Sequence, residues 1–156
     1  MRWIGVLIFI FSILPFVGCA SLFSSNPDAL RIEDVDRPIS EIRAIAARLL
    51  PVGQRAISPN GHEILSKHFK MDGTKYVPAA DAAERFYAHI VILGDRRPYD
   101  IEVFVVHEKR AARENDYTYA RVGVDPKLTS DLEQSLRQEL TKRREERNII
   151  DDFRVY

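Results

Sequence analysis

The clearest hydrophobic pattern in the chain lies between residues 85 and 109. Two runs rich in aromatic and β-branched residues, 85–94 and 99–109, flank the short polar segment 95–98. Residues of these types are enriched in strands, and a short connection suits two neighbouring antiparallel strands. The pattern therefore predicts a β-hairpin at 85–109.

The alternation within these two runs sets the register of the hairpin. A four-residue connection pairs Gly94 with Tyr99, and this pair determines every later one. A slip of one residue would exchange the two faces, so the clean sorting of side chains favours this register. One face then carries the core candidates, which are Phe86, Ala88, Ile90, Ile92, Ile101, Val103 and Val105, with His107 at its end.

The other face of the hairpin is mixed in character. It carries Tyr87, His89, Val91, Leu93, Asp100, Glu102, Phe104 and Val106. A third strand is predicted at 117–124, where apolar and polar residues alternate. We expect the apolar side of this strand to join the core, and that side consists of Ala120, Val122 and Val124. The other side adds Tyr117, Tyr119 and Arg121 to the mixed face.

Two stretches have helical periodicity. Residues 40–50 are predicted to form a helix that ends at Pro51 and Gly53. Its apolar face is made by Ile39, Ile42, Ile45, Ala46 and Leu49. The last helix opens with Asp125 as N-cap and Pro126 at its first position, and leucines follow at four-residue spacing, namely Leu128, Leu132, Leu136 and Leu140.

The remaining segments complete the expected architecture. A short strand is predicted at 54–58, a turn at 58–61 and a second strand at 62–71. Residues 141–147 are charged and solvated, whereas the apolar residues after position 148 should pack back or add a strand. This order predicts an α+β fold, a two-layer sandwich of an antiparallel sheet with a meander core. The N-terminal and C-terminal helices are expected to lie on one face of that sheet.

The first 19 residues have the pattern of a secretory signal. Arg2 precedes an apolar run, and Phe16, Val17 and Gly18 lead to Cys19. This ending resembles the lipobox of bacterial lipoprotein precursors. The resemblance implies a signal peptide at 1–18, lipidation of Cys19, and a tether at 19–37 before a single domain at 38–156. An uncleaved membrane anchor and an ordinary secretory signal are the alternatives.

The same resemblance implies a location. Ala20 stands where an Asp would hold an enterobacterial lipoprotein at the inner membrane. A place in the bacterial cell envelope is therefore expected, anchored by lipid to the membrane and facing the periplasm, with the outer membrane favoured. The order helix, strands, helix behind a lipobox also looks like several small outer-membrane lipoproteins that assist assembly of lipopolysaccharide or protein machines. That second likeness is one of architecture and carries no shared motif.

Charge and cysteine content limit the possible functions. The chain has 23 basic and 23 acidic residues, and loss of Arg2 with the signal would leave 22 against 23. This balance argues against a general binder of nucleic acid or of a membrane surface. Cys19 is the only cysteine, so the mature domain has neither a disulfide nor a thiolate site for zinc.

The sequence offers no catalytic motif. His62-Glu63 begins a zinc-helix pattern, but Ser66 stands where the second His is needed. His89 and His107 fall on opposite faces of the predicted hairpin and cannot share a metal. No serine has the flanking glycines of a nucleophile elbow. We therefore expect a non-enzymatic protein without catalytic residues, cofactor or metal.

The mixed sheet face is the best candidate for a binding surface. It combines aromatic area with polar groups, which is typical of interfaces, in Tyr87, His89, Phe104, Tyr117, Tyr119 and Arg121. The leading hypothesis is that this face docks or helps to assemble another envelope component, which is expected to be a protein. The other interpretation of the face is that residues 62–82 or the C-terminal tail of the same chain cover it.

A rival function uses two basic clusters instead. Arg96 and Arg97 lie at the hairpin turn, and Lys109 and Arg110 lie near Arg113 in the next loop. These clusters are expected at opposite ends of the sheet, so they cannot form one anion site. They leave open a domain on a lipid anchor that binds a periplasmic glycan or a small ligand.

Overall fold

The computed structural model describes residues 26–111 and 118–152, with side chains as far as Lys142. The signal peptide, Cys19, Arg113, Tyr117, Phe153 and Val155 lie outside these residues. The described part is an open, mostly antiparallel β-sheet with two helices, so the predicted α+β class is confirmed. The elements in chain order are β1 Leu30–Val35, α1 Ile39–Leu49, β2 Gln54–Ile57, β3 Glu63–Ser66, β4 Phe69–Asp72, β5 Lys75–Pro78, β6 Glu84–Leu93, β7 Tyr99–Arg110, β8 Tyr119–Val124 and α2 Pro126–Asp152.

The hairpin of β6 and β7 forms the centre of the sheet. Its register is the predicted one, because Ile92 pairs with Ile101 and Ala88 pairs with Val105. The remaining strands are shorter, and four of them share the two outer edges of this hairpin, while β2 pairs with β3 and β5 pairs with β4. β1 and β8 lie one after the other along β7, while β3 and β4 do the same along β6. The sheet is therefore more than the predicted meander, since β1 pairs with β7 from far away in the sequence.

Two buried hydroxyl groups close the gaps between these short strands. The amide of Val105 donates to Oγ1 of Thr129 at 2.9 Å, between the parts of β7 that pair with β1 and β8. The amide of Ala88 donates to Oγ of Ser66 at 2.8 Å, between the parts of β6 that pair with β3 and β4. Both hydroxyl residues are almost fully buried. Each thus satisfies a buried amide that no strand reaches, and Thr129 also fixes α2 against β7.

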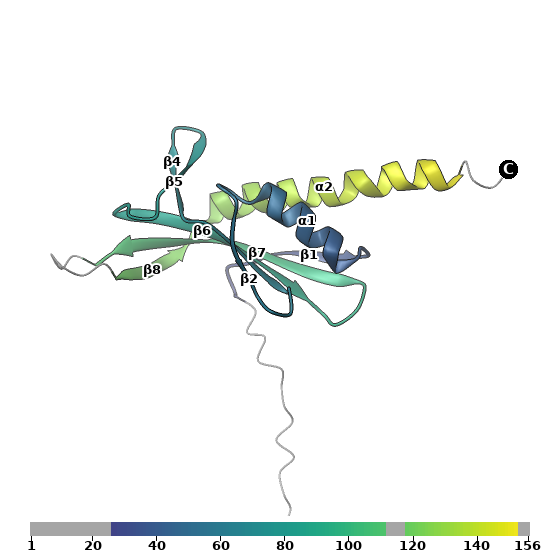
Figure 1. The fold of residues 1–156 in the computed structure, drawn as a ribbon, viewed down its shortest axis with the longest axis horizontal. Coiled ribbons are helices and arrows are strands. Elements are labelled where there is room, and N and C mark those ends of the chain that lie inside the picture. Colours follow the sequence, from purple (N-terminus) through teal and green to yellow (C-terminus); the bar gives the residue numbers. More distant parts are fainter. Residues whose placement is uncertain (1–25, 112–117, 153–156) are drawn as a thin grey trace, which may run out of the picture.

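The core lies on the face of the hairpin that the sequence predicted. All seven apolar core candidates of the hairpin are fully or partly buried in one hydrophobic cluster. The same cluster contains side chains of both helices, which are Ile42, Ile45 and Ala46 from α1 and Leu128, Leu132, Leu136 and Leu140 from α2. Figure 1 shows α2 running on past the edge of the sheet.

The predicted tether is wrong for its last residues. Residues 30–35 form β1, where Ile32 pairs with Ile101 and is buried. Arg37 is also buried, and its guanidinium pairs with Glu41 at 2.7 Å and donates to the carbonyl of Leu140. The charged residues between the apolar positions of β1 point away from the core and hide the strand pattern in the sequence. The folded domain therefore begins at or before β1.

Three further expectations need correction. Residues 62–71 form two strands, β3 and β4, and β4 turns at Gly73 into the unpredicted β5. The apolar side of β8 does not join the core, since Val122 is 56% exposed. A register shift in the β7–β8 pairing places Val124 opposite Val106, on the face away from the core cluster. Finally, residues 149–152 belong to α2, so they do not add a strand.

The observed register predicts opposite outcomes for two neighbouring substitutions. Ile90 is fully buried, so Ile90→Lys should place an uncompensated charge in the core and cost several kcal/mol of unfolding free energy. Val91 pairs with Glu63 and Glu102 on the other face, so a lysine there meets carboxylates and should change stability far less. Chemical denaturation of both variants measures the difference. Equal losses would contradict the register.

Candidate functional site

The candidate site is the open face, meaning the side of the sheet away from the core cluster. The register of β6 and β7 turns Arg85, Tyr87 and His89 to this side, together with Phe104 and Glu108. The pairing of β8 with β7 brings two further side chains there, since Tyr119 lies opposite Arg110 and Arg121 lies opposite Glu108. Five of the six residues predicted for the partner surface thus share one face, and Tyr117 is outside the described residues.

These five residues are not equally accessible. Phe104 is only 7% exposed, and the ring of His89 packs 4.7 Å from it between centroids. Tyr87 and Tyr119 are half-buried, whereas Arg121 is exposed. Phe104 therefore belongs to the packing of the domain, and Tyr87 with Arg121 offers the more accessible surface.

An arginine–aromatic cluster surrounds Tyr87. The guanidinium of Arg55 lies 5.4 Å from the centre of the Tyr87 ring, and the ring of His68 meets Tyr87 edge-on at 5.7 Å. Arg55 donates to Nε2 of His68 at 3.0 Å. Arg85 donates from Nε to Glu108 at 2.8 Å, so an ion pair completes the cluster beside the rings. We use the name arginine–aromatic cluster for these five residues together with Arg121.

The charges in this cluster do not balance. Glu108 pairs with Arg85, and among the described residues no carboxylate lies at ion-pairing distance from Arg55 or Arg121. Burial raises the pKa of Tyr87, and so does the charge of Glu108, while Arg121, Arg55 and Arg85 act in the opposite direction. Three guanidinium groups thus act on one tyrosine against a single carboxylate. The cluster carries a surplus of positive charge on a half-exposed surface.

The chain itself covers one end of the open face. The hydroxyl of Tyr119 donates to the carbonyls of Ala80 and Ala82, and the guanidinium of Arg85 lies 3.3 Å from the centre of the Tyr119 ring. Arg110 donates to the carbonyl of Asp81 in the same loop. The interpretation that residues 62–82 cover the face therefore holds near Tyr119. It does not extend to Arg121, which stays exposed.

The far end of the open face is acidic. Asp100 pairs with Arg31 at 2.5 Å and accepts the amide of Asp34 at 3.1 Å. Arg31 first and then this backbone hydrogen bond lower the pKa of Asp100. Glu102 lies next along β7 and is 5% exposed. The open face thus runs from a basic end at Arg55 and Arg121 to an acidic end, where Asp100 is paired with Arg31 and Glu102 is buried.

The sequence alone did not identify four members of the cluster, and they fall into two groups. Arg85 and Glu108 are cross-strand partners in the predicted register, so their contact could have been inferred from that register. Arg55 and His68 come from the region 54–71, where the sequence has no clean period. Their approach to Tyr87 depends on a register shift in the pairing of β2 with β3 and on the break between β3 and β4.

The histidines do not assemble a metal site. His89 lies 3.4 Å from Glu63 on the open face, while His107 lies 3.3 Å from Glu84 and stacks on Phe86 on the other side. The predicted separation of His89 and His107 is confirmed. Across residues 26–111 and 118–152, no three side chains of ligand type come together as a metal site would require.

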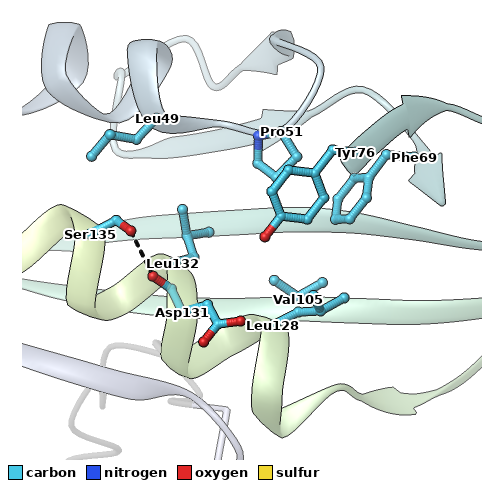
Figure 2. A pocket seen from close by; sticks show the side chains of 9 residues that line it. All are labelled: Leu49, Pro51, Phe69, Tyr76, Val105, Leu128, Asp131, Leu132 and Ser135. Carbon is cyan, nitrogen blue, oxygen red and sulfur yellow. Dashed lines mark hydrogen bonds between the residues drawn. The ribbon is translucent and has the colours of Figure 1, made fainter. Parts of the chain in front are cut away.

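A small cavity lies on the helix side, between α2, the end of α1 and the β4–β5 hairpin. Its volume is about 90 Å³, and Figure 2 shows the rings of Phe69 and Tyr76 above Leu128 and Leu132. The hydroxyl of Ser135 is occupied by the carbonyl of Asp131 at 2.8 Å. Ligand sites usually measure roughly 300–1,000 Å³. This cavity is too small for such a site. We interpret it as imperfect packing beside the core.

Comparisons of the chain with protein-family models, with curated proteins and with solved structures find no match. Within the described part of the chain, no helix combines the length and the apolar character that crossing a membrane requires.

Two histidines of the open face should make stability depend on pH. Burial lowers the pKa of His68 and of His89 below the ordinary value of 6.5, and Arg85 and Arg55 lower that of His68 further. Because the unfolded chain binds these protons more readily, the free energy of unfolding should fall as the pH drops below about 6.5. Denaturation midpoints at about pH 7.5 and about pH 5 measure this. Changing both histidines to Gln should shrink the loss, and an unchanged loss would assign it to other groups.

Proposed function

We propose that this chain is a non-enzymatic, lipid-anchored protein of the bacterial envelope that docks another envelope component on its open face. Cys19 is the proposed site of lipid attachment, and no catalytic residue, cofactor or metal takes part. The proposal includes the two-layer interpretation of the fold, in which both helices cover one face and leave the other for the partner. Anchoring at the outer membrane, facing the periplasm, follows from the lipobox resemblance.

The observation that carries this proposal is the arginine–aromatic cluster. Arginine and tyrosine are enriched at interfaces because each combines a large contact area with directed hydrogen bonding. Here Tyr87, Arg55 and Arg121 lie together on the side of the sheet away from the core cluster, and Arg55 and Arg121 are exposed. A surplus of like charge lowers the stability of the isolated domain, which favours a role in binding.

The contacts also change which residues serve as anchors. Tyr119 was expected to hold a partner, but its hydroxyl already donates to Ala80 and Ala82. Its role is to hold that loop and to support Arg85. Tyr87 and Arg121 are therefore the proposed anchors, and truncation of Tyr119 is expected to act through stability.

The rival function, binding of a glycan or small ligand by the basic loops, has less support. Arg97 lies at the β6–β7 turn, 3.8 Å from Asp36, and Arg110 at the other end of β7 donates to the chain's own loop. These two groups are separated by the length of β7, as the sequence predicted. They do not converge on one ligand.

The lipid anchor makes a prediction of its own. Cys19→Ala should block acylation and leave an unprocessed precursor that keeps residues 1–18, because the thiol is the acceptor in the proposed modification. Intact-mass spectrometry of the membrane fraction distinguishes the two forms. A wild-type chain that starts elsewhere than Cys19, or carries no acyl mass, would disprove the anchor.

Docking is tested by comparing the two sides of the domain. A photo-crosslinking residue at Leu65, which pairs with His89 on the open face, should capture an envelope component in intact cells. The same residue at Gln138, exposed on α2, should not. Adding Arg121→Glu should reduce capture at position 65, because it reverses a charge of the proposed anchor. Equal capture from both positions would count against docking at the open face.

A further inference from the structure

The basic end of the open face holds a positive charge that the domain does not neutralise. Arg85 is paired with Glu108, but Arg55 and Arg121 have no such partner among the described residues. Both are exposed, and Arg55 is held in place by the ring of Tyr87 and by His68. A guanidinium group presents a planar fork of N–H donors that matches the oxygens of a phosphate. The N–H donors of Arg55 and Arg121 are therefore suited to bind an oxyanion such as a phosphate.

The arrangement of these arginines favours an extended ligand. Arg55, Arg85 and Arg121 come from three different strands, β2, β6 and β8. Their guanidinium groups gather around Tyr87, and those of Arg55 and Arg121 are exposed at the surface of the open face. An exposed group of cations at the end of a sheet face can meet a flat surface that carries several phosphates.

The course of the chain before β1 indicates which surface is near. Figure 1 shows the described residues before β1 turning to the side of the sheet away from the helices. Only six residues lie between Cys19 and Asn26, and the seven steps from Cys19 to Asn26 span at most roughly 25 Å when fully extended. A lipid on Cys19 would thus keep the domain close to the bilayer, with its open face on the side from which the chain arrives.

We propose that the basic end of the open face binds the phosphate groups of anionic lipid headgroups in the membrane that holds the anchor. This inference rests on the proposed function, from which it takes the lipid anchor and the open face. It identifies the envelope component that binds at the basic end as an anionic lipid. At the other end of the open face Asp100 is already paired with Arg31 and Glu102 is only 5% exposed, so these residues add no attraction to the same surface. The domain therefore tilts, with Arg55 and Arg121 toward the headgroups and the β6–β7 turn away from them.

The orientation can be measured on the full-length lipidated chain in vesicles. Val122, beside Arg121 and 56% exposed, is changed to Cys and labelled with a fluorophore, and Ser130→Cys on α2 serves as the helix-side control. Nitroxide on the headgroups quenches a nearby label. Quenching at position 122 should be stronger in vesicles of phosphatidylcholine with phosphatidylglycerol than in phosphatidylcholine alone, and stronger than at position 130.

Charge variants show whether the cluster causes this orientation. A basic side chain near an anionic membrane contributes about 1 kcal/mol, so Arg55→Gln with Arg121→Gln should lower the ratio of headgroup-facing to free domains about 30-fold. The matched control, Arg96→Gln with Arg97→Gln at the β6–β7 turn, removes the same charge and should leave the ratio unchanged. Higher salt should reduce the extra quenching at position 122 that phosphatidylglycerol causes in the chain with all its arginines, because surface charges are screened.

Several results would overturn the headgroup assignment. One such result is quenching at position 122 that does not depend on phosphatidylglycerol. Another is an equal loss of quenching in both pairs of arginine variants, and a third is stronger quenching at position 130 than at position 122. Binding of inorganic phosphate without any vesicle effect would assign the site to a soluble anion, and a crosslinked acidic protein without a vesicle effect would assign it to a protein. Failure of the anchor is separate, because an unlipidated Cys19 would take up a second fluorophore, which mass spectrometry detects.

Discussion

The pairing of β6 with β7 is the constraint on which the rest of the structure depends. All ten residues of β6 are paired with β7, from Glu84 opposite Lys109 to Leu93 opposite Asp100. Because side chains alternate, this one register sends Ile90 and Val103 into the core and Tyr87 and Glu108 to the open face. Every shorter strand then adds to an edge whose two faces are already assigned. The core face and the open face of the sheet are thus decided by the same hydrogen bonds.

A long hairpin flanked by short strands leaves backbone groups unpaired, and α2 is positioned by one of them. Thr129 accepts the amide of Val105, while the carbonyl of Val105 accepts the amide of Asp125 at the start of the helix. Asp125 also caps α2, accepting the amide of Leu128 at 2.9 Å. The helix therefore begins where the sheet needs a partner. From that start its leucines lie along the core as far as Leu140, whose carbonyl is held by Arg37.

The parts of the structure that could be predicted from sequence are those in which the pattern is local and uninterrupted. The hairpin register, α1 and the cap of α2 each follow from a run whose period is unbroken. β1 was missed because Ile32 and Val35 lie among charges, and its partner β7 is about 70 residues away in the chain. The same limit applies to the site. Tyr87, His89 and Arg121 could be placed on one face, but Arg55 and His68 reach it only through irregular pairing around β2 and β3.

Stability alone gives a poor account of the arginine–aromatic cluster. The side chains of the Arg85–Glu108 ion pair are only 14% and 16% exposed, so the cost of desolvating them offsets much of their attraction, and unpaired arginines nearby reduce the gain further by repulsion. His68 accepts a hydrogen bond from Arg55, which requires an uncharged ring nitrogen, and burial with the neighbouring arginines lowers the pKa of that ring. The lowered pKa favours the neutral ring of His68, whose nitrogen can then accept the hydrogen bond from Arg55 at the surface. An anion bound at Arg55 and Arg121 would reduce the repulsion between the arginines. The repulsion that lowers the stability of the free domain would therefore strengthen binding of the anion.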